Sequence, residues 1–172
     1  AYYIMQNSKS ILINAKILSK IDVSLGFADI AIKNNYCLPT IHKKQEITLV
    51  ASRHPVIENL LPIDDNFISN DINLNSDIKQ IAVITGPNMA GKSTFLRQVA
   101  LISIMAQIGS YIPANKADLC IIDKVYTRVG ASDNLSEGES TFLVEMNETA
   151  NILNNATSKS LLILDEIGRG TS

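Results

Sequence analysis

Apolar side chains recur at every third or fourth position over the first part of the chain, from about residue 6 to residue 33. Seven of them form the repeat: Ile11, Ala15, Leu18, Ile21, Leu25, Ala28 and Ile32. This spacing places them on one stripe of an α-helix, which Asn34 and Pro39 bring to an end. The predicted helix is much longer than average. Its length favours a helix that connects this domain to another part of the protein over a core helix of the same domain. We therefore expect a helical region over 1–40 and a second domain over 41–172.

Short apolar runs typical of β-strands divide the rest of the chain. The strand candidates are 47–51, 81–85, 124–129 and 161–164. Between two of them, residues 62–79 have the Asp, Asn and Ser content of a loop. Together with the helices below, the runs predict an α/β fold built on an open, parallel sheet. A parallel sheet needs strands on both sides of its central ones, so we expect this sequence to be a truncated piece of a larger protein.

Two helices are predicted within the second domain. Apolar residues surround most of the segment from Thr94 to Ile108, as in a helix that is buried on several sides, and Gly109 is suited to its C-terminal stop. The second helix follows residue 140. Its apolar stripe is formed by Phe142, Met146, Ala150 and Leu153.

A glycine-containing loop joins strand candidate 81–85 to the first of these helices. It consists of Gly86, Pro87, Asn88, Met89, Ala90, Gly91, Lys92, Ser93 and Thr94, which matches the phosphate-loop pattern G-x-x-x-x-G-K-[ST]. The glycines let successive backbone N–H groups turn toward one point, where the helix dipole also attracts an anion. Lys92 would reach the β- and γ-phosphates of a nucleotide and Ser93 would ligate Mg²⁺. The alternative is a strand-to-helix turn without a ligand, in which Lys-Ser after the second glycine has no structural necessity.

Two adjacent carboxylates, Asp165 and Glu166, end the last strand candidate. Ligands of open α/β sheets bind at the carboxyl ends of strands, so these side chains would emerge beside the phosphate loop. Asp165 would hold Mg²⁺ and Glu166 would polarise the water that attacks the γ-phosphate of ATP. The alternative is a pair of solvated loop charges.

Two further sites are predicted from weaker signals. Phe67 and Ile68 lie inside the polar stretch 62–79, either as a hydrophobic anchor or as a flat surface on which a purine stacks. Ser140 lies where a helix begins, either as a simple cap or as a second phosphate-binding device for a nucleotide held by another subunit.

Charge and composition narrow the function further. The formal net charge is −2, with 15 Lys and Arg against 17 Asp and Glu, so this segment is not itself a basic surface for DNA. Cys37 and Cys120 are isolated, and they and the two histidines are interpreted as structural rather than as metal ligands. No apolar run has the length of a membrane span and no signal sequence is visible. These features indicate the cytoplasm in a bacterium, or the mitochondrion or nucleus in a eukaryote.

Three stretches together resemble the ATPase domain of the MutS family of DNA mismatch repair proteins. They are 85–94, the pair 133–135 and 140–146, and 164–172, and the triplet Arg53-His54-Pro55 fits as well. The resemblance implies a P-loop NTPase of the ABC superfamily, preceded by the end of a lever helix. It implies that ATP and Mg²⁺ bind at the phosphate loop with Asp165 and Glu166, that Phe67 and Ile68 contact adenine, and that Ser140 reaches the partner's γ-phosphate.

The resemblance also implies partners. The family forms clamp-shaped dimers with composite ATP sites at the dimer interface, grips mismatched double-stranded DNA through other domains, and acts with a downstream factor of the MutL type. The mismatch-reading domain would lie before residue 1. We expect the isolated piece to hold half a site, to bind nucleotide weakly and not to turn over.

Three alternatives stay open. Residues 135–139 resemble the signature loop of transporter-type ABC ATPases, although the 73-residue spacing from Lys92 to Asp165 is short for them. A MutS relative of recombination or ribosome rescue is disfavoured by the pair Asn88-Met89. A module in which ATP only fixes a dimer, without hydrolysis, is disfavoured by Glu166.

Overall fold

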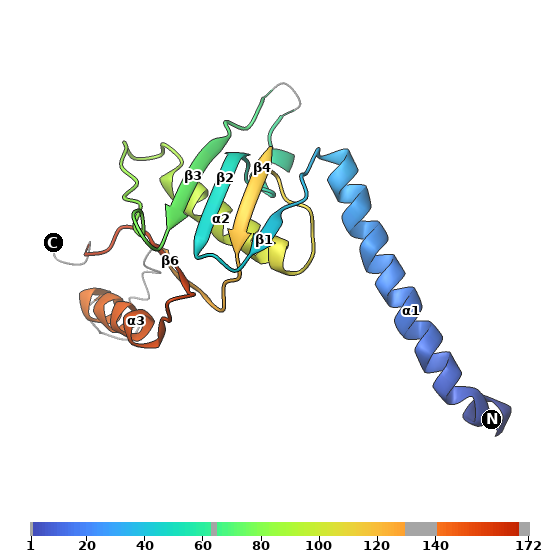
Figure 1. Cartoon of the computed structure of the whole chain (residues 1–172). Helices are drawn as coiled ribbons and strands as arrows, with labels where there is room; N and C mark the ends of the chain where they lie inside the picture. The colour runs from blue at the N-terminus through green and yellow to red at the C-terminus, as the bar shows by residue number, and fades with distance from the viewer. Residues whose placement is uncertain (1, 63–64, 130–140, 169–172) are drawn as a thin grey trace.

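The computed structural model describes residues 2–62, 65–129 and 141–168. In chain order, its elements are α1 (Tyr2–Lys33), β1 (Thr40–His42), β2 (Glu46–Ser52), the 3₁₀ turn η1 (Ile57–Asn59), β3 (Asn70–Asn75), α2 (Lys92–Gln107), β4 (Lys116–Cys120), β5 (Val125–Arg128), α3 (Thr141–Asn155) and β6 (Leu161–Leu164). The fold is mixed α/β, and Figure 1 shows α2 lying across one face of a sheet while α1 projects away from it.

The larger sheet has four strands in the order β1-β4-β2-β3. Only β1 and β4 run parallel, whereas β2 pairs antiparallel with both β3 and β4. The expectation of a parallel sheet is therefore wrong for these strands. Period-two alternation of apolar residues does not reveal strand direction, which depends on how distant segments pair.

The hydrophobic core lies between this sheet and α2. Its most completely buried large apolar side chains include Leu49 of β2, Ile102 of α2 and Leu119 of β4, together with Ile112 from the segment between α2 and β4. Strand candidates 47–51, 124–129 and 161–164 coincide with β2, β5 and β6, and the first two of these predictions differ from the structure only at their ends. The core thus fixes α2, and with it the loop from which α2 starts.

A second, two-stranded parallel sheet joins β5 to β6, with Val125 opposite Leu161 and Arg128 opposite Leu164. Helix α3 packs against β5, and β6 contacts α2. Glu166, just after the carboxyl end of β6, lies near the residues that begin α2, as the sequence pattern predicted.

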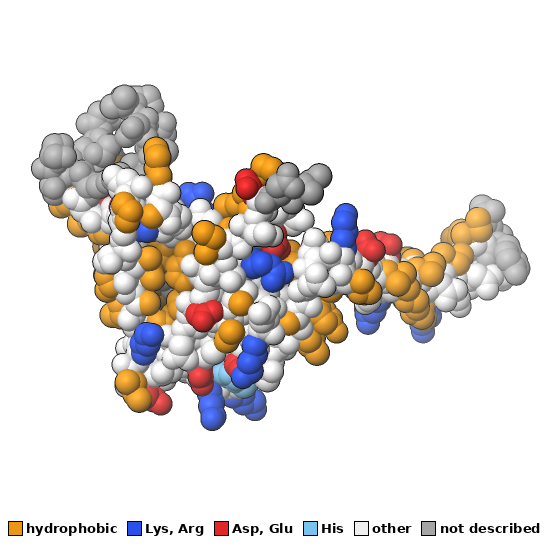
Figure 2. Space-filling view, turned by 90° about the horizontal axis from the view of Figure 1, so that it is seen from above, with side chains coloured by type: hydrophobic (Ala, Val, Ile, Leu, Met, Phe, Trp, Pro, Cys, Tyr) orange, Lys and Arg blue, Asp and Glu red, His pale blue; other side chains and the backbone are white. Residues whose placement is uncertain are grey.

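Helix α1 contains the predicted stripe, yet the described part of the chain covers almost none of it. Among residues 4–33 only Ala31 is buried and Phe27 is half-buried. Apolar side chains are therefore exposed along the helix, as Figure 2 shows. None of the described helices combines the length and the apolar character that crossing a membrane requires.

Two predictions in the middle of the chain are wrong. Residues 81–85 form no strand, and Ile81 and Val83 are exposed. A strand needs a neighbour with which to exchange backbone hydrogen bonds, and among the described residues none pairs with this segment. Conversely, the predicted loop 62–79 contains β3, whose polar residues alternate with the half-buried Ile72 and Leu74.

The predicted helix faces also need correction. Helix α2 is buried over more than half of its circumference, through Gln98, Val99, Ala100, Ile102, Ser103 and Ala106. The predicted burial on several sides is therefore confirmed for most of the segment, whereas Ile104 and Ile108 are exposed. In α3 the buried residues are Glu145 and Ile152, whereas Phe142 and Leu153 of the predicted stripe are exposed. Apolar residues lie on more than one face of each helix, and packing selects the face.

Candidate functional site

The predicted phosphate loop, residues 86–94, leads into α2 through a left-handed residue. Gly91 precedes the helix with φ of +85°, a conformation that favours glycine, and Gly91 O accepts the Phe95 amide at 2.9 Å. Lys92 Nζ folds back over the loop and donates to Gly86 O at 2.9 Å and to Pro87 O at 2.8 Å. The positive charge of Lys92 therefore lies directly above the turn.

A hollow of about 440 Å³ opens at this point. It is lined by Asn88, Met89, Gly91, Lys92, Ser93, Thr94 and Glu166. Its size falls within the range of ordinary ligand pockets, roughly 300–1,000 Å³. The structure thus brings the loop residues together with a carboxylate that is 74 positions beyond Lys92 in the sequence.

Three predicted site residues that the structure describes, Asp165, Phe67 and Ile68, lie outside the lining of this hollow. Asp165 ends β6 with a buried side chain, and its backbone amide donates to Arg128 O at 2.8 Å. Phe67 is half-buried and Ile68 is 85% exposed, both on the segment that leads into β3. Ser140 and residues 133–135 lie outside the described residues. The roles assigned to these residues stay predictions.

The backbone around Glu166 is held from helix α3. Glu166 has φ of +52° and Gly168 has φ of +88°, so two of three consecutive residues are left-handed. Gly168 N donates to the buried carboxylate of Glu145 at 2.6 Å. Sequence analysis missed Glu145, although an acidic residue among the apolar positions of a helix could have suggested a buried carboxylate.

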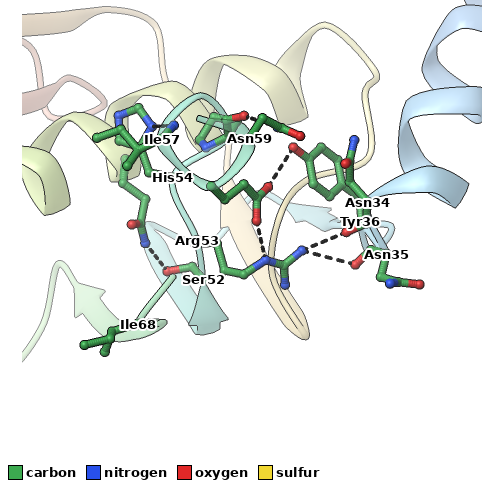
Figure 3. A network of polar contacts seen from close by, with 12 residues as sticks. Asn34, Asn35, Tyr36, Ser52, Arg53, His54, Ile57, Asn59 and Ile68 are labelled. Carbon is green, nitrogen blue, oxygen red and sulfur yellow. Dashed lines mark hydrogen bonds and ion pairs between the residues drawn. The ribbon is translucent and has the colours of Figure 1, made fainter. Parts of the chain in front are cut away.

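A polar network joins the end of α1 to the segment after β2 (Figure 3). Arg53 Nε pairs with Glu58 Oε2 at 2.6 Å, and Arg53 Nη2 donates to Asn34 O at 2.9 Å. The Tyr36 hydroxyl donates to the second oxygen of Glu58 at 2.9 Å. Burial, together with this carboxylate, raises the pKa of Tyr36 to about 12. The network anchors the C-terminal end of α1, where backbone carbonyls lack helical partners.

The two neighbours of Arg53 have other partners, and one of them, Ser52, connects to α2. Ser52 Oγ donates to Asn70 O at 2.6 Å and accepts from Gln98 Nε2 of α2 at 2.8 Å. His54 is buried, and its Nδ1 accepts the amides of Val56 and Ile57 at 3.2 Å each. Burial lowers the pKa of His54, so the ring is held neutral. Two consecutive residues thus connect different helices to this segment: Ser52 contacts α2, and Arg53 contacts the end of α1.

The described residues contain no cluster of three or more His, Cys, Asp or Glu side chains suited to a metal ion. The two cysteines are free, as expected. A divalent cation at the hollow would therefore depend on a ligand set shared with a bound anion, as is usual for Mg²⁺.

The fold and the hollow together define a mixed α/β protein with a phosphate-loop sequence pattern at the start of α2. Comparison with known proteins identifies its family. The family model described as MutS domain V matches residues 82–172. A protein of Cytophaga hutchinsonii named DNA mismatch repair protein MutS is 58% identical over 162 residues, which is 94% of this chain and 19% of the relative. Proteins with the same name from Desulforapulum autotrophicum and Clostridium botulinum are 57% and 55% identical over 98% and 99% of this chain.

The chain therefore belongs to the MutS family, as its sequence motifs predicted. It spans about a fifth of the length of the curated relatives it matches. The activity and partners of the whole relatives are therefore only proposed for this chain.

Proposed function

We propose that this chain provides the nucleotide-binding half of a Mg²⁺-dependent ATPase site, of the P-loop and ABC type, that serves DNA mismatch repair. The observation that carries the proposal is the hollow in which Lys92, Ser93 and Glu166 meet. A lysine, a hydroxyl and a carboxylate around one hollow are the set that phosphoryl transfer to water requires. Membership of the MutS family supports the link to mismatch repair.

The groups present fit a nucleotide and its metal. The two loop carbonyls that Lys92 now contacts hold its ammonium where a phosphate oxygen would compete for it. Ser93 and Glu166 offer oxygen donors, the type that Mg²⁺ prefers, and Asp165 adds another at the end of β6. The metal supplies neutralisation of phosphate charge when it is bound. Phe67 and Ile68 would contact adenine.

Each residue then has a defined task. Lys92 binds the β- and γ-phosphates, and the backbone amides after Gly91 orient them. Ser93 and Asp165 hold the metal. Glu166 accepts a hydrogen bond from the attacking water and so positions that water against the γ-phosphate. Product charge is then stabilised by Lys92.

The site is open on one side, and we propose that a second subunit completes it, with Ser140 of the partner copy facing the γ-phosphate. Mismatched double-stranded DNA would act through other parts of the intact protein, and a MutL-type factor would respond to the nucleotide state. The cytoplasm remains the expected compartment in a bacterium.

The test compares ATP binding and turnover by the intact protein that carries this sequence, with and without mismatched duplex DNA. We expect Lys92→Ala to lose nucleotide binding and Glu166→Gln to retain binding but lose turnover. Lys79→Ala, which removes an exposed lysine upstream of the loop, serves as the matched control and should change neither.

Two results would contradict the proposal. If Glu166→Gln hydrolyses ATP at the normal rate, the residue has no catalytic role and a module that only assembles around ATP becomes the better description. If Glu166→Gln abolishes turnover but mismatched DNA does not change the turnover rate of the unsubstituted protein, the ATPase assignment stands and the assignment to mismatch repair fails.

A further inference from the structure

Glu145 is a buried carboxylate that is 5% exposed and lies one turn into α3. Burying a carboxylate is costly unless hydrogen bonds compensate it. Glu145 Oε1 accepts the amide of Gly168 at 2.6 Å, a short, charge-assisted bond. The bond therefore connects α3 to the turn that follows β6.

That turn carries Glu166, whose carboxylate lines the hollow above the phosphate loop. Glu166 is a non-glycine residue in the left-handed region, which persists only where surrounding contacts enforce it. Upstream, the backbone is fixed by β6 through the bond from Asp165 N to Arg128 O. Downstream, the bond from Gly168 to Glu145 fixes it.

We propose that Glu145 is the positioning residue for Glu166. It does not reach the nucleotide site itself; it holds the Gly168 amide and thereby sets the backbone conformation that aims Glu166 into the hollow. The inference rests on the proposed role of Glu166 in polarising water.

The length of the Glu145 side chain, and not its charge, is the decisive property in a positioning role. Glutamine keeps the length of the side chain and a carbonyl acceptor but has no charge. Aspartate keeps the charge but is one methylene shorter, so its oxygen cannot stay at 2.6 Å from Gly168 N without movement of the backbone. A positioning role therefore predicts that glutamine replaces Glu145 better than aspartate does, and a purely electrostatic role predicts the reverse order.

The experiment measures kcat and the dissociation constant for ATP in the intact protein with Glu145→Ala, Glu145→Gln and Glu145→Asp. We expect Glu145→Ala to lower kcat by about 100-fold, the cost of a misplaced catalytic group. ATP binding should stay near normal, because Lys92 and the loop amides are untouched. Glu145→Gln should recover most of the lost rate, and Glu145→Asp should recover little.

Glu148→Ala is the matched control, because it removes a carboxylate from the same helix three positions further on, where Glu148 pairs with Arg128. It should leave kcat unchanged even where it lowers the melting temperature. Hydrogen exchange at residues 165–168 gives a readout independent of turnover, and it should accelerate in Glu145→Ala and not in Glu148→Ala.

The outcomes separate this inference from the proposed function. If Glu166→Gln loses turnover while Glu145→Ala keeps it, Glu145 is not a positioning residue. An equal loss of kcat in Glu145→Ala and Glu148→Ala would also overturn the inference, since it would mark general destabilisation of α3. Should Glu145→Ala fail to fold, the order of Glu145→Gln and Glu145→Asp decides. If Glu166→Gln turns over normally, the proposed function itself has failed.

Discussion

The ion pair between Arg53 and Glu58 should contribute more to stability than any other ion pair in the described part of the chain. The side chains are 20% and 13% exposed, and Nε and Oε2 are 2.6 Å apart. Removing one partner of a buried pair costs about 3–5 kcal/mol, because the other charge is left without compensation. Residual exposure of both side chains points to the lower end of that range.

Each single substitution also removes a second contact. Arg53→Ala deletes the bond to Asn34 O, and Glu58→Ala leaves the Tyr36 hydroxyl without this acceptor. Hydrogen bonds to charged groups contribute about 1.5–3 kcal/mol each. We expect each single variant to lose about 3–4 kcal/mol of unfolding free energy, and the double variant to lose about 2 kcal/mol less than the sum of the two.

The assay is a double-mutant cycle in urea, followed by far-ultraviolet circular dichroism. The pair of Lys116 and Asp118 is the matched control, since its Nζ and Oδ2 are 2.9 Å apart but the side chains are 69% and 26% exposed. Solvent and salt should screen that pair and leave a much smaller coupling energy. A coupling energy for Arg53 and Glu58 no larger than that of the exposed pair would refute the reasoning.

Four more predictions concern pH, backbone and core. Burial lowers the pKa of His54 below its usual 6.5, so stability should be complete above pH 6.5 and fall as the pH drops toward the folded value; His54→Asn should flatten this slope in urea titrations, and an unchanged slope would contradict it. The pKa of Tyr36 is raised from 10.0 to about 12, so the neutral phenol favours the folded state and stability should be lost as pH rises from 10 through about 12; Tyr36→Phe should lose less over that window, measured as the difference between the two proteins. Gly91→Ala should cost about 1–2 kcal/mol through its left-handed φ alone, since no atom lies near the added Cβ, whereas Gly26→Ala within α1 should be neutral or stabilising; equal effects would show that φ is not the cause. Leu49→Ala should lower the free energy of unfolding by about 2–5 kcal/mol, measured by thermal or urea unfolding, because Leu49 is almost fully buried. A loss below about 1 kcal/mol would contradict the tight packing of Leu49 in the core.

Local patterns in the sequence determined much of the secondary structure and the chemistry of the candidate site. The long helix, β2, α2, β5 and β6 follow from periodicity, and the left-handed residues before and after α2, Gly91 and Gly109, follow from residue type. Phosphate-loop spacing and the carboxylates after β6 predicted that Lys92 and Glu166 would meet, because both lie at the ends of buried elements. The helices, the strands and the loop pattern depend on residues within a few positions of one another, and the general rule that ligands bind at the carboxyl ends of strands connected the loop to Glu166.

Tertiary structure alone decided strand pairing, the buried helix faces and the support of Glu166. Segment 81–85 has a strand's pattern but no partner within 2–62, 65–129 and 141–168, whereas 70–75 is polar and pairs with β2, because pairing depends on which backbones become neighbours. Glu145 and Gly168 are 23 positions apart, and Arg53 and Asn34 are 19 apart. A backbone amide or carbonyl has the same chemistry at every residue, so no sequence pattern reveals which one a distant side chain will bind; only the packing of α1, α2 and α3 settles it.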